Sequence, residues 1–231
     1  MFGRLLIAAL ITGVSAGLIV SAVQAVRVSP LIYYAEAFEE AAQAEGAAHA
    51  HDDGSLHDHG GAGPGSFQRI ALTVLANSLA GIGFGLVMGA AMIFANRHVN
   101  WRRGLLWGLA GFVVFALGPA LQLPPDPPGV DLGSVELRGA IWAFIAFMSG
   151  LGLWLIAFRK SWRWKAVGVA VLVLPQVAGI PEFVDDRAVV PDAVIGQFIA
   201  AALLTTGVFW LCLGGIMGGV YSRLVQSTPA R

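Results

Sequence analysis

The chain has 231 residues, of which 57% are hydrophobic and only 12% are charged, and its formal net charge is zero. A soluble domain has about 25% charged residues, so this chain has too little polar surface to cover a water-soluble globule. Its 30 glycines also indicate a membrane protein rather than a soluble one, because small residues let helices pack closely inside a membrane. The single cysteine, Cys212, excludes an intrachain disulfide and a cysteine-based zinc site.

Six apolar segments approach or reach the roughly 20 residues that cross about 30 Å of hydrocarbon. They contain no Asp, Glu, Lys, Arg or His and span residues 5–26, 70–95, 104–123, 139–158, 166–180 and 193–221. The sequence therefore predicts an all-α polytopic membrane protein, a single transmembrane domain over residues 1–231 with a bundle of six transmembrane helices. The fifth segment is short and contains Pro175, which removes a helix donor. Five helices with a re-entrant fifth segment is the alternative.

Basic and acidic residues are segregated between alternate connections. Most Lys and Arg gather near the two termini and in the connections 96–103 and 159–165, whereas every Asp and Glu falls within 36–58, 126–136 or 182–192. Because basic connections stay on the cytoplasmic side, we expect both termini in the cytoplasm of a bacterial inner membrane. The connection 27–69 then lies outside. This segregation favours six helices, since a re-entrant fifth segment would exchange the sides of the regions that follow it.

The outer connection 27–69, which we expect to be largely disordered around 45–66, holds four of the five histidines in two His-x-His pairs. Neutral imidazole binds late divalent transition metals, and interleaved carboxylates offset the charge of the ion. The candidate ligands are His49, His51, His57, His59, Asp52, Asp53 and Asp58. A flexible loop predicts exchangeable capture that weakens as the pH falls through about 6.5. The alternative is a solvated linker that binds no metal.

Glu36 and Glu40 lie four residues apart ahead of the histidines. They would share one face if this stretch is helical, and could then form a second oxygen site. A solvated acidic face is the favoured interpretation. His98 stands alone in a basic connection and is interpreted as a surface residue.

The apolar segments themselves lack ionisable groups, so the sequence predicts no intramembrane carboxylate for proton coupling. It also contains no phosphate-binding loop. If an ion crosses, its expected ligands are backbone carbonyls freed by Pro119 and Pro175, together with Gln122 and Gln176. Simple helix kinks are the alternative.

Pairs of glycines four residues apart predict faces on which helices pack. These pairs are Gly13/Gly17, Gly85/Gly89, Gly104/Gly108, Gly214/Gly218 and Gly215/Gly219.

Several motifs together resemble one known family over nearly the whole chain. They are RLLIAAL at residues 4–10, the acidic and then histidine-rich outer loop, WRRGLLWGLAGF at 101–112, GPALQLPPDPPG at 118–129, LPQVAGIP at 174–181 and FWLCLGGIMGGVY at 209–221. In these motifs the chain resembles the CbtA family, the predicted cobalt transporter subunit of bacteria. The resemblance implies cobalt uptake for cobalamin synthesis, beside a small single-helix partner, CbtB, that carries its own histidine motif.

The sequence thus predicts a membrane subunit of a transition-metal uptake transporter, with Co²⁺ as the ion and Ni²⁺ or Zn²⁺ as chemical alternatives. No permanently bound cofactor is expected, and the expected partners are the divalent metal ion, the lipid bilayer and a CbtB-type subunit, with no nucleic acid. A metal-binding accessory or sensor that transports nothing is the alternative function, and a membrane scaffold without metal is a third. An enzyme is not expected, because the sequence shows no nucleophile, acid–base pair or closed metal site.

Overall fold

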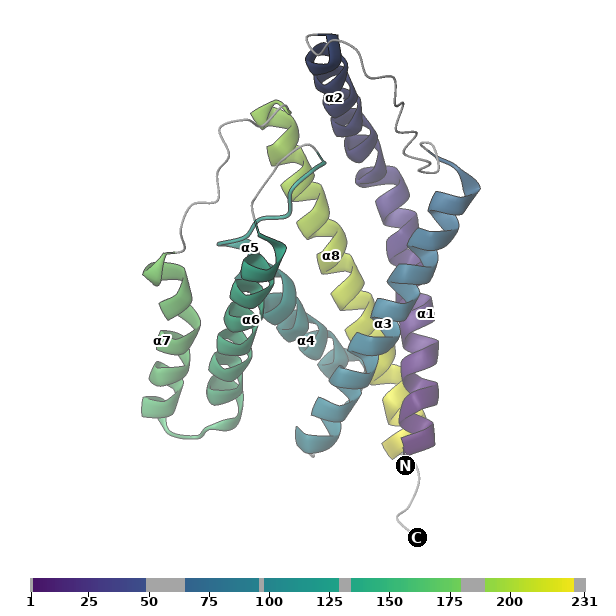
Figure 1. The fold of residues 1–231 in the computed structure, drawn as a ribbon. Coiled ribbons are helices and arrows are strands. Elements are labelled where there is room, and N and C mark those ends of the chain that lie inside the picture. Colours follow the sequence, from purple (N-terminus) through teal and green to yellow (C-terminus); the bar gives the residue numbers. More distant parts are fainter. Residues whose placement is uncertain (1, 49–64, 96–97, 129–133, 180–189, 227–231) are drawn as a thin grey trace.

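The computed structural model describes residues 2–48, 65–95, 98–128, 134–179 and 190–226, which are mostly helical and include no strand (Figure 1). The all-α prediction is confirmed for these residues. In chain order the elements are α1 (Phe2–Arg27), α2 (Ser29–Ala48), α3 (Phe67–Ala95), α4 (Trp101–Phe112), the π-helical turn η1 (Val113–Leu117), α5 (Gly118–Ala120), α6 (Val135–Phe158), α7 (Trp162–Ala178), α8 (Asp192–Tyr221) and the π-helical turn η2 (Ser222–Gln226).

Within the described residues, five helices are long and apolar enough to cross a membrane by length and composition, namely Phe2–Arg27, Phe67–Ala95, Trp101–Ala120, Val135–Phe158 and Asp192–Val225. α7 is not among them, because its 17 residues extend only about 26 Å, against about 30 Å of hydrocarbon. The predicted count of six transmembrane helices is therefore not confirmed. A helix does form at the fifth segment, and it continues past Pro175 instead of ending there.

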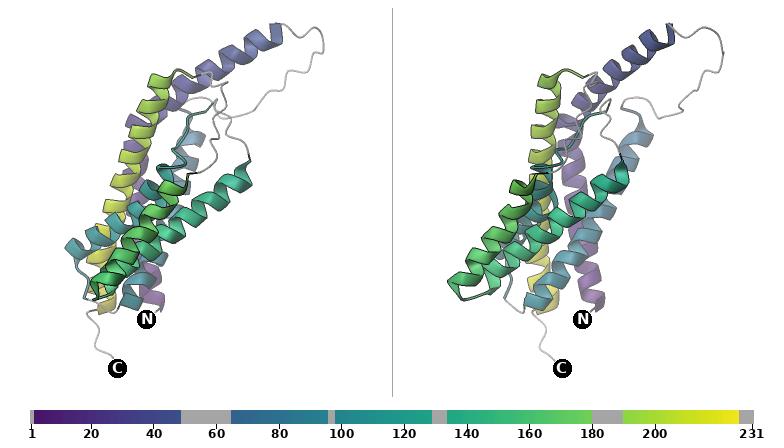
Figure 2. Two further views of the ribbon diagram at one scale, coloured as in Figure 1. Left: turned by 90° about the vertical axis from the view of Figure 1, so that its left-hand side faces the viewer. Right: turned by 60° about the vertical axis from the view of Figure 1, so that its left-hand side comes forward.

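The bundle has a basic end and an acidic end. Figures 1 and 2 show α1 starting, α6 turning into α7 and α8 ending at one end, while α2 and the start of α8 lie at the other. The described basic residues at the first end, called the basic end, are Arg4, Arg102, Arg103, Arg159, Lys160, Arg163, Lys165 and Arg223. The acidic residues whose side chains are described all belong to the opposite, acidic end and are Glu36, Glu39, Glu40, Asp126, Glu136 and Asp192.

Two arginines at the acidic end are neutralised by partners. Arg69 forms an ion pair with Glu36. Arg138 forms another with Asp126. A third arginine, Arg27 in the last turn of α1, also lies at this end, so the acidic end has three described arginines against the eight basic residues of the basic end.

Glycines allow the closest helix contacts, as the sequence predicted for several of the pairs. α1 packs along α3, where a Cβ atom on Gly81 would lie 2.6 Å from the carbonyl oxygen of Gly13. α4 packs along α8 in the same way, and a Cβ atom on Gly214 would lie 2.6 Å from the Cα of Gly108. The prediction is wrong for Gly219, because a Cβ atom added there would meet no other atom within 4 Å and would face open space.

Aromatic side chains join the two glycine-packed pairs. The ring of Trp210 on α8 stacks on Phe115 of η1, with centroids 5.5 Å apart and planes 6° apart. The ring centroid of Phe84 on α3 lies 4.9 Å from that of the same indole. Trp210 is 3% exposed and belongs to the main hydrophobic core. This cluster places η1, the irregular part of the third segment, directly against α3 and α8.

The chain after α1 differs from the expected loop. α1 continues through a turn at Val28 into α2, which remains helical to Ala48. Ala35 on α2 is fully buried and packs with Val190 and Val194 at the start of α8. The run is rich in Ala and Glu, which favour helix, and its apolar face finds a tertiary partner. The expected disorder around 45–66 falls mostly on residues 49–64, which lie outside the described part of the chain.

Candidate functional site

The predicted metal ligands belong to the segment 49–64, which lies outside the described residues. The set remains a prediction, and its members are His49, His51, Asp52, Asp53, His57, Asp58 and His59. Among the residues that the structure does describe, no group of three or more His, Cys, Asp or Glu side chains is placed to hold a metal ion.

The two sides of this histidine segment are fastened together by described residues. The Arg69 guanidinium donates two hydrogen bonds to the Glu36 carboxylate, at 3.2 Å from Nη1 and 2.5 Å from Nη2. Arg69 also lies over the ring of Tyr33, 5.0 Å from its centroid. The backbone N–H of Gly65 donates to the Tyr33 hydroxyl at 3.0 Å. These contacts form a base that holds the start of α3, where the segment re-enters the bundle, against the first half of α2, whereas the segment leaves from Ala48 at the far end of α2.

This base affects the second predicted oxygen site. Both carboxylate oxygens of Glu36 accept hydrogen bonds from Arg69, so they are engaged in an ion pair. Glu40 is exposed on the same helix. The arrangement agrees with the favoured interpretation of an acidic surface rather than with a two-glutamate metal site.

The third predicted segment is irregular at its proline. The N–H of Gly118 donates to the Val113 carbonyl, the spacing of a π-helix, rather than to Val114. Pro119 has no N–H, so the Phe115 carbonyl loses its usual donor as well. Single π-helical turns of this kind inside α-helices are frequent at functional sites. The carbonyls of Val114 and Phe115 are thus released from normal helical bonding at the acidic half of the bundle.

Gln122 and Gln176, which the sequence singled out beside the two prolines, meet between the end of α5 and α7. The Gln122 side-chain amide donates to the backbone carbonyl of Gln176 at 3.0 Å and to its side-chain oxygen at 3.4 Å. The Gln176 amide donates to the carbonyl of Gly118 at 3.1 Å. The structure therefore brings both proline-containing helix ends together. In this conformation the two amides bind each other and the backbone, which fits the kink alternative better than an open ion path.

Ser149 is a further polar residue at this junction, one of the few polar residues of the apolar segments, to which the sequence assigned no role. It is 1% exposed, and its Oγ makes no hydrogen bond to the described residues. A Cβ atom on Gly118 would lie 2.7 Å from this oxygen, so the hydroxyl faces the broken helix. Only the tertiary packing of α6 against α5 reveals that this serine faces Gly118, because a lone serine in an apolar segment does not indicate which helix it contacts.

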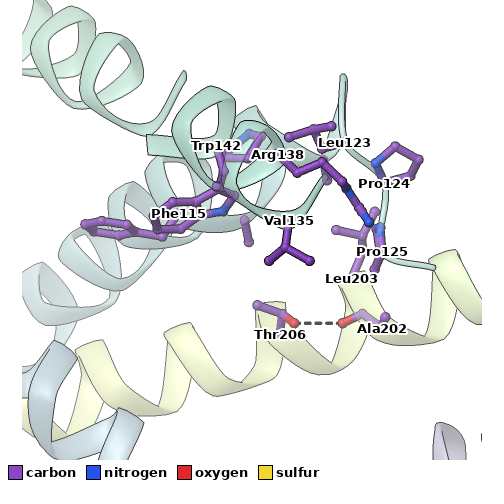
Figure 3. A pocket seen from close by; sticks show the side chains of 14 residues that line it. Phe115, Leu123, Pro124, Pro125, Val135, Arg138, Trp142, Ala202, Leu203 and Thr206 are labelled. Atoms are coloured by element: carbon purple, nitrogen blue, oxygen red, sulfur yellow. Dashed lines mark hydrogen bonds between the residues drawn. The ribbon is translucent and has the colours of Figure 1, made fainter. Parts of the chain in front are cut away.

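An open cavity of about 460 Å³, a surface hollow rather than an enclosed space, lies on another side of the broken helix, between α5, the start of α6 and α8 (Figure 3). Its walls are mostly apolar and include Phe115, Trp142 and Leu203. The hydroxyl of Thr206, which also lines it, donates to the carbonyl of Ala202 at 2.8 Å. An apolar wall of this kind suits hydrocarbon rather than a bare metal ion.

The rim of the cavity carries one ion pair, in which Arg138 Nη2 lies 2.9 Å from Asp126 Oδ2. Burial raises the pKa of the Asp126 carboxyl, although the nearby Arg138 charge acts in the opposite direction. Asp126 therefore stands out among the described carboxylates as one that is both paired and substantially removed from water.

These features define a class: a helical membrane protein with several apolar spans, charge-segregated ends and a proline-broken polar junction. The family described as "Probable cobalt transporter subunit (CbtA)" matches residues 2–222, which is nearly the whole chain. The chain therefore belongs to the CbtA family. Its family description implies a metal ion and further subunits as partners. Comparison with curated proteins and with solved structures found no match.

Proposed function

We propose that this chain is the membrane subunit of a transition-metal uptake transporter whose cargo is Co²⁺. The observation that carries the proposal is family membership over residues 2–222. Ni²⁺ and Zn²⁺ satisfy the same imidazole and carboxylate chemistry, so ion selectivity has to arise elsewhere than in the histidine segment.

The histidine and aspartate side chains of the segment 49–64 capture the ion in this proposal. Support comes from the spacing of the two His-x-His pairs and from the Glu36–Arg69–Tyr33 base, which holds the point where the segment re-enters the bundle against α2. A ligand-bearing segment that is tethered to the bundle by the chain on both sides has a raised effective concentration of its ligands near the bundle. Capture is exchangeable, so the ion can pass on.

The orientation in the proposal follows the charge difference between the bundle ends. The basic end faces the cytoplasm of a bacterial inner membrane, and the acidic end with the histidine segment faces outward. Support comes from the gathering of eight described basic side chains at the basic end, against three at the acidic end, where Arg69 and Arg138 are paired with carboxylates and Arg27 ends α1. A small single-helix partner of the CbtB type completes the transporter.

Uptake of radiolabelled Co²⁺ and Ni²⁺ into cells that express the chain with its partner tests this function. Replacing His49, His51, His57 and His59 together by Ala is expected to lower uptake at limiting metal concentration, with recovery at high metal. His98→Ala is the matched control, because it removes a histidine at the basic end and is expected to leave uptake unchanged. Absence of uptake by the intact chain and partner would contradict the transport proposal, and equal uptake by the fourfold variant would contradict the capture role alone.

A metal-binding accessory or sensor is the second candidate, and one observation favours it. The polar junction is closed in this structure, since Gln122 and Gln176 bind each other and the Gly118 carbonyl. Equilibrium binding of Co²⁺ to the purified chain separates the two functions. Metal binding without uptake in the presence of the partner supports the accessory role.

A further inference from the structure

The turn between α6 and α7 carries an unusual concentration of positive charge. Residues 159–165 contain four basic side chains in seven positions, and all of these residues are exposed. Three tryptophans lie in or beside the turn, and Trp162 is 74% exposed, Trp164 49% and Trp154 45%. Basic clusters immediately beside membrane helices attract anionic lipids, at about 1 kcal/mol for each Lys or Arg near the surface. The basic side chains are Arg159, Lys160, Arg163 and Lys165.

Arg159 is held in place by two of these tryptophans. Its guanidinium carbon lies 4.9 Å from the ring centroid of Trp154 on α6 and 5.5 Å from that of Trp164 on α7. A planar guanidinium stacked on aromatic faces keeps its N–H donors free at the edge, where they can bind a phosphate in bidentate fashion. The turn thus offers a positioned phosphate-binding group rather than four unrestrained charges.

No described carboxylate competes for this charge. The ion pairs Arg69–Glu36 and Arg138–Asp126 lie at the acidic end, far from this turn. The other basic connection is arranged differently, because Arg103 donates to the carbonyl of His98 and Arg102 lies over the ring of Trp101. The α6–α7 turn is therefore the denser of the two described sites of uncompensated positive charge.

The helices beside the turn complete a surface for a lipid. α7 exposes Val169 and Val173, which lie four residues apart on the same face of the helix as the exposed Trp162 of the turn. Tryptophan rings favour the headgroup level of a bilayer, and the exposed valines suit acyl chains below it. α7 is also short, and flanking residues that bind at the membrane interface help a short helix to keep its position in the bilayer.

We propose that the α6–α7 turn binds the phosphate headgroup of an anionic phospholipid, with Arg159 between Trp154 and Trp164 as its central contact and the α7 valines against the acyl chains. The site anchors the α6–α7 hairpin at the basic end of the bundle. It is independent of the metal-transport proposal, since it requires neither cobalt nor the histidine segment.

Lipid binding to the purified full chain in neutral detergent tests the site. Dioctanoyl phosphatidylglycerol and dioctanoyl phosphatidylcholine are titrated separately, and bound lipid is counted by native mass spectrometry. Phosphatidylglycerol is expected to bind more tightly. Arg159→Gln is expected to weaken it about fivefold, the equivalent of about 1 kcal/mol for one basic residue. The affinity of Arg159→Lys for phosphatidylglycerol is expected to fall between those of the unchanged chain and Arg159→Gln, because lysine keeps the charge and loses the planar group.

Arg102→Gln is the matched control, since it removes an arginine of the same end that also lies over a tryptophan. It is expected to leave phosphatidylglycerol affinity unchanged. Three outcomes would overturn the proposal: equal affinity for the two lipids, an equal loss in Arg102→Gln, or displacement of the lipid by inorganic phosphate at matched concentration. The last outcome would identify a site for free phosphate instead. The melting temperature of each variant shows whether it is folded, and Arg159 is exposed, so its replacement leaves the core intact.

Discussion

Asp126 shows how two opposing effects act on one carboxyl. Its side chain is 15% exposed, and this burial raises its pKa above the usual value of 3.8, while Arg138 favours the charged form. An acid whose pKa is raised in the folded state stabilises the fold most when protonated, at pH values below the pKa of the unfolded chain. That contribution is lost as the pH rises through the folded pKa. The ion pair with Arg138 therefore limits a destabilisation that burial causes.

Arg138→Gln tests this balance. Removing the guanidinium is expected to raise the pKa of Asp126 further, because only the effect of burial remains. As the pH rises from acidic to neutral, the free energy of unfolding should also fall by more in the variant than in the unchanged chain. Infrared titration of isotope-labelled aspartates and thermal unfolding at several pH values measure the two effects. An unchanged or lowered pKa in the variant would contradict this account of Asp126.

The amides of Gln122 and Gln176 form the principal polar link between the two proline-containing ends in the described structure. Gln122→Leu and Gln176→Leu are each expected to destabilise the chain, with a coupling of about 0.6 kcal/mol in a double-mutant cycle, the average for hydrogen bonds between membrane helices. Unfolding of the purified protein in mixed micelles measures this coupling. Gln197→Leu is the matched control, because Gln197 lies on an exposed face of α8. Strict additivity of the two junction variants would show that the amides do not cooperate.

At the scale of elements, glycines decide which faces of the helices can pack closely against each other. α4 and α8 approach backbone to backbone, and a Cβ atom on Gly218 would lie 2.6 Å from the carbonyl oxygen of Asn100. The neighbouring Gly219 has nothing within 4 Å of its Cβ position. Without a hydrophobic driving force between helices in lipid, such close packing supplies much of the attraction.

Gly218→Ala is expected to destabilise the bundle by about 1–3 kcal/mol, the range for overpacking a close interface. The clash is with backbone, which has little freedom to move aside. Gly219→Ala is the matched control and is expected to change stability little, since the added methyl meets open space. Unfolding in micelles measures both. Equal effects of the two substitutions would contradict the observed face of α8.

At the scale of the whole molecule, the direction of α7 determines on which side of the membrane the chain after it lies. α7 runs beside α6 away from the basic end, and α8 returns from the acidic end (Figure 1). Yet α7 has only 17 residues. A short helix can still cross where the bilayer thins or where flanking residues anchor it. Whether it crosses decides on which side residues 180–189 lie.

Cysteine labelling decides the crossing of α7. In a Cys212→Ser background, Ser55→Cys and Asp185→Cys are expected to react with an impermeant maleimide in intact cells, because both belong to acidic connections. Ser161→Cys is expected to react only after permeabilisation, since it lies in the basic α6–α7 turn. Labelling of Asp185→Cys only after permeabilisation would instead establish the five-helix alternative.

The sequence by itself determined the helical class, the apolar segments and the separation of basic from acidic connections. These properties are local, because the interaction of twenty apolar residues or of a cluster of arginines with the bilayer does not depend on which other segments pack beside them. It also indicated that Pro119 and Pro175 matter. Each proline removes a hydrogen-bond donor wherever the chain places it.

Only the tertiary structure decided which of these features meet. Gln122 and Gln176 are 54 positions apart, and their contact depends on how α6 and α7 fold back. The helix α2 was missed because its apolar side is stabilised by Val190 and Val194, which are distant in sequence. The structure also showed that Ser149 is buried beside Gly118. It showed as well that Arg159 lies between two tryptophans on different helices. Contacts between segments depend on packing geometry, which hydropathy and charge counts do not contain.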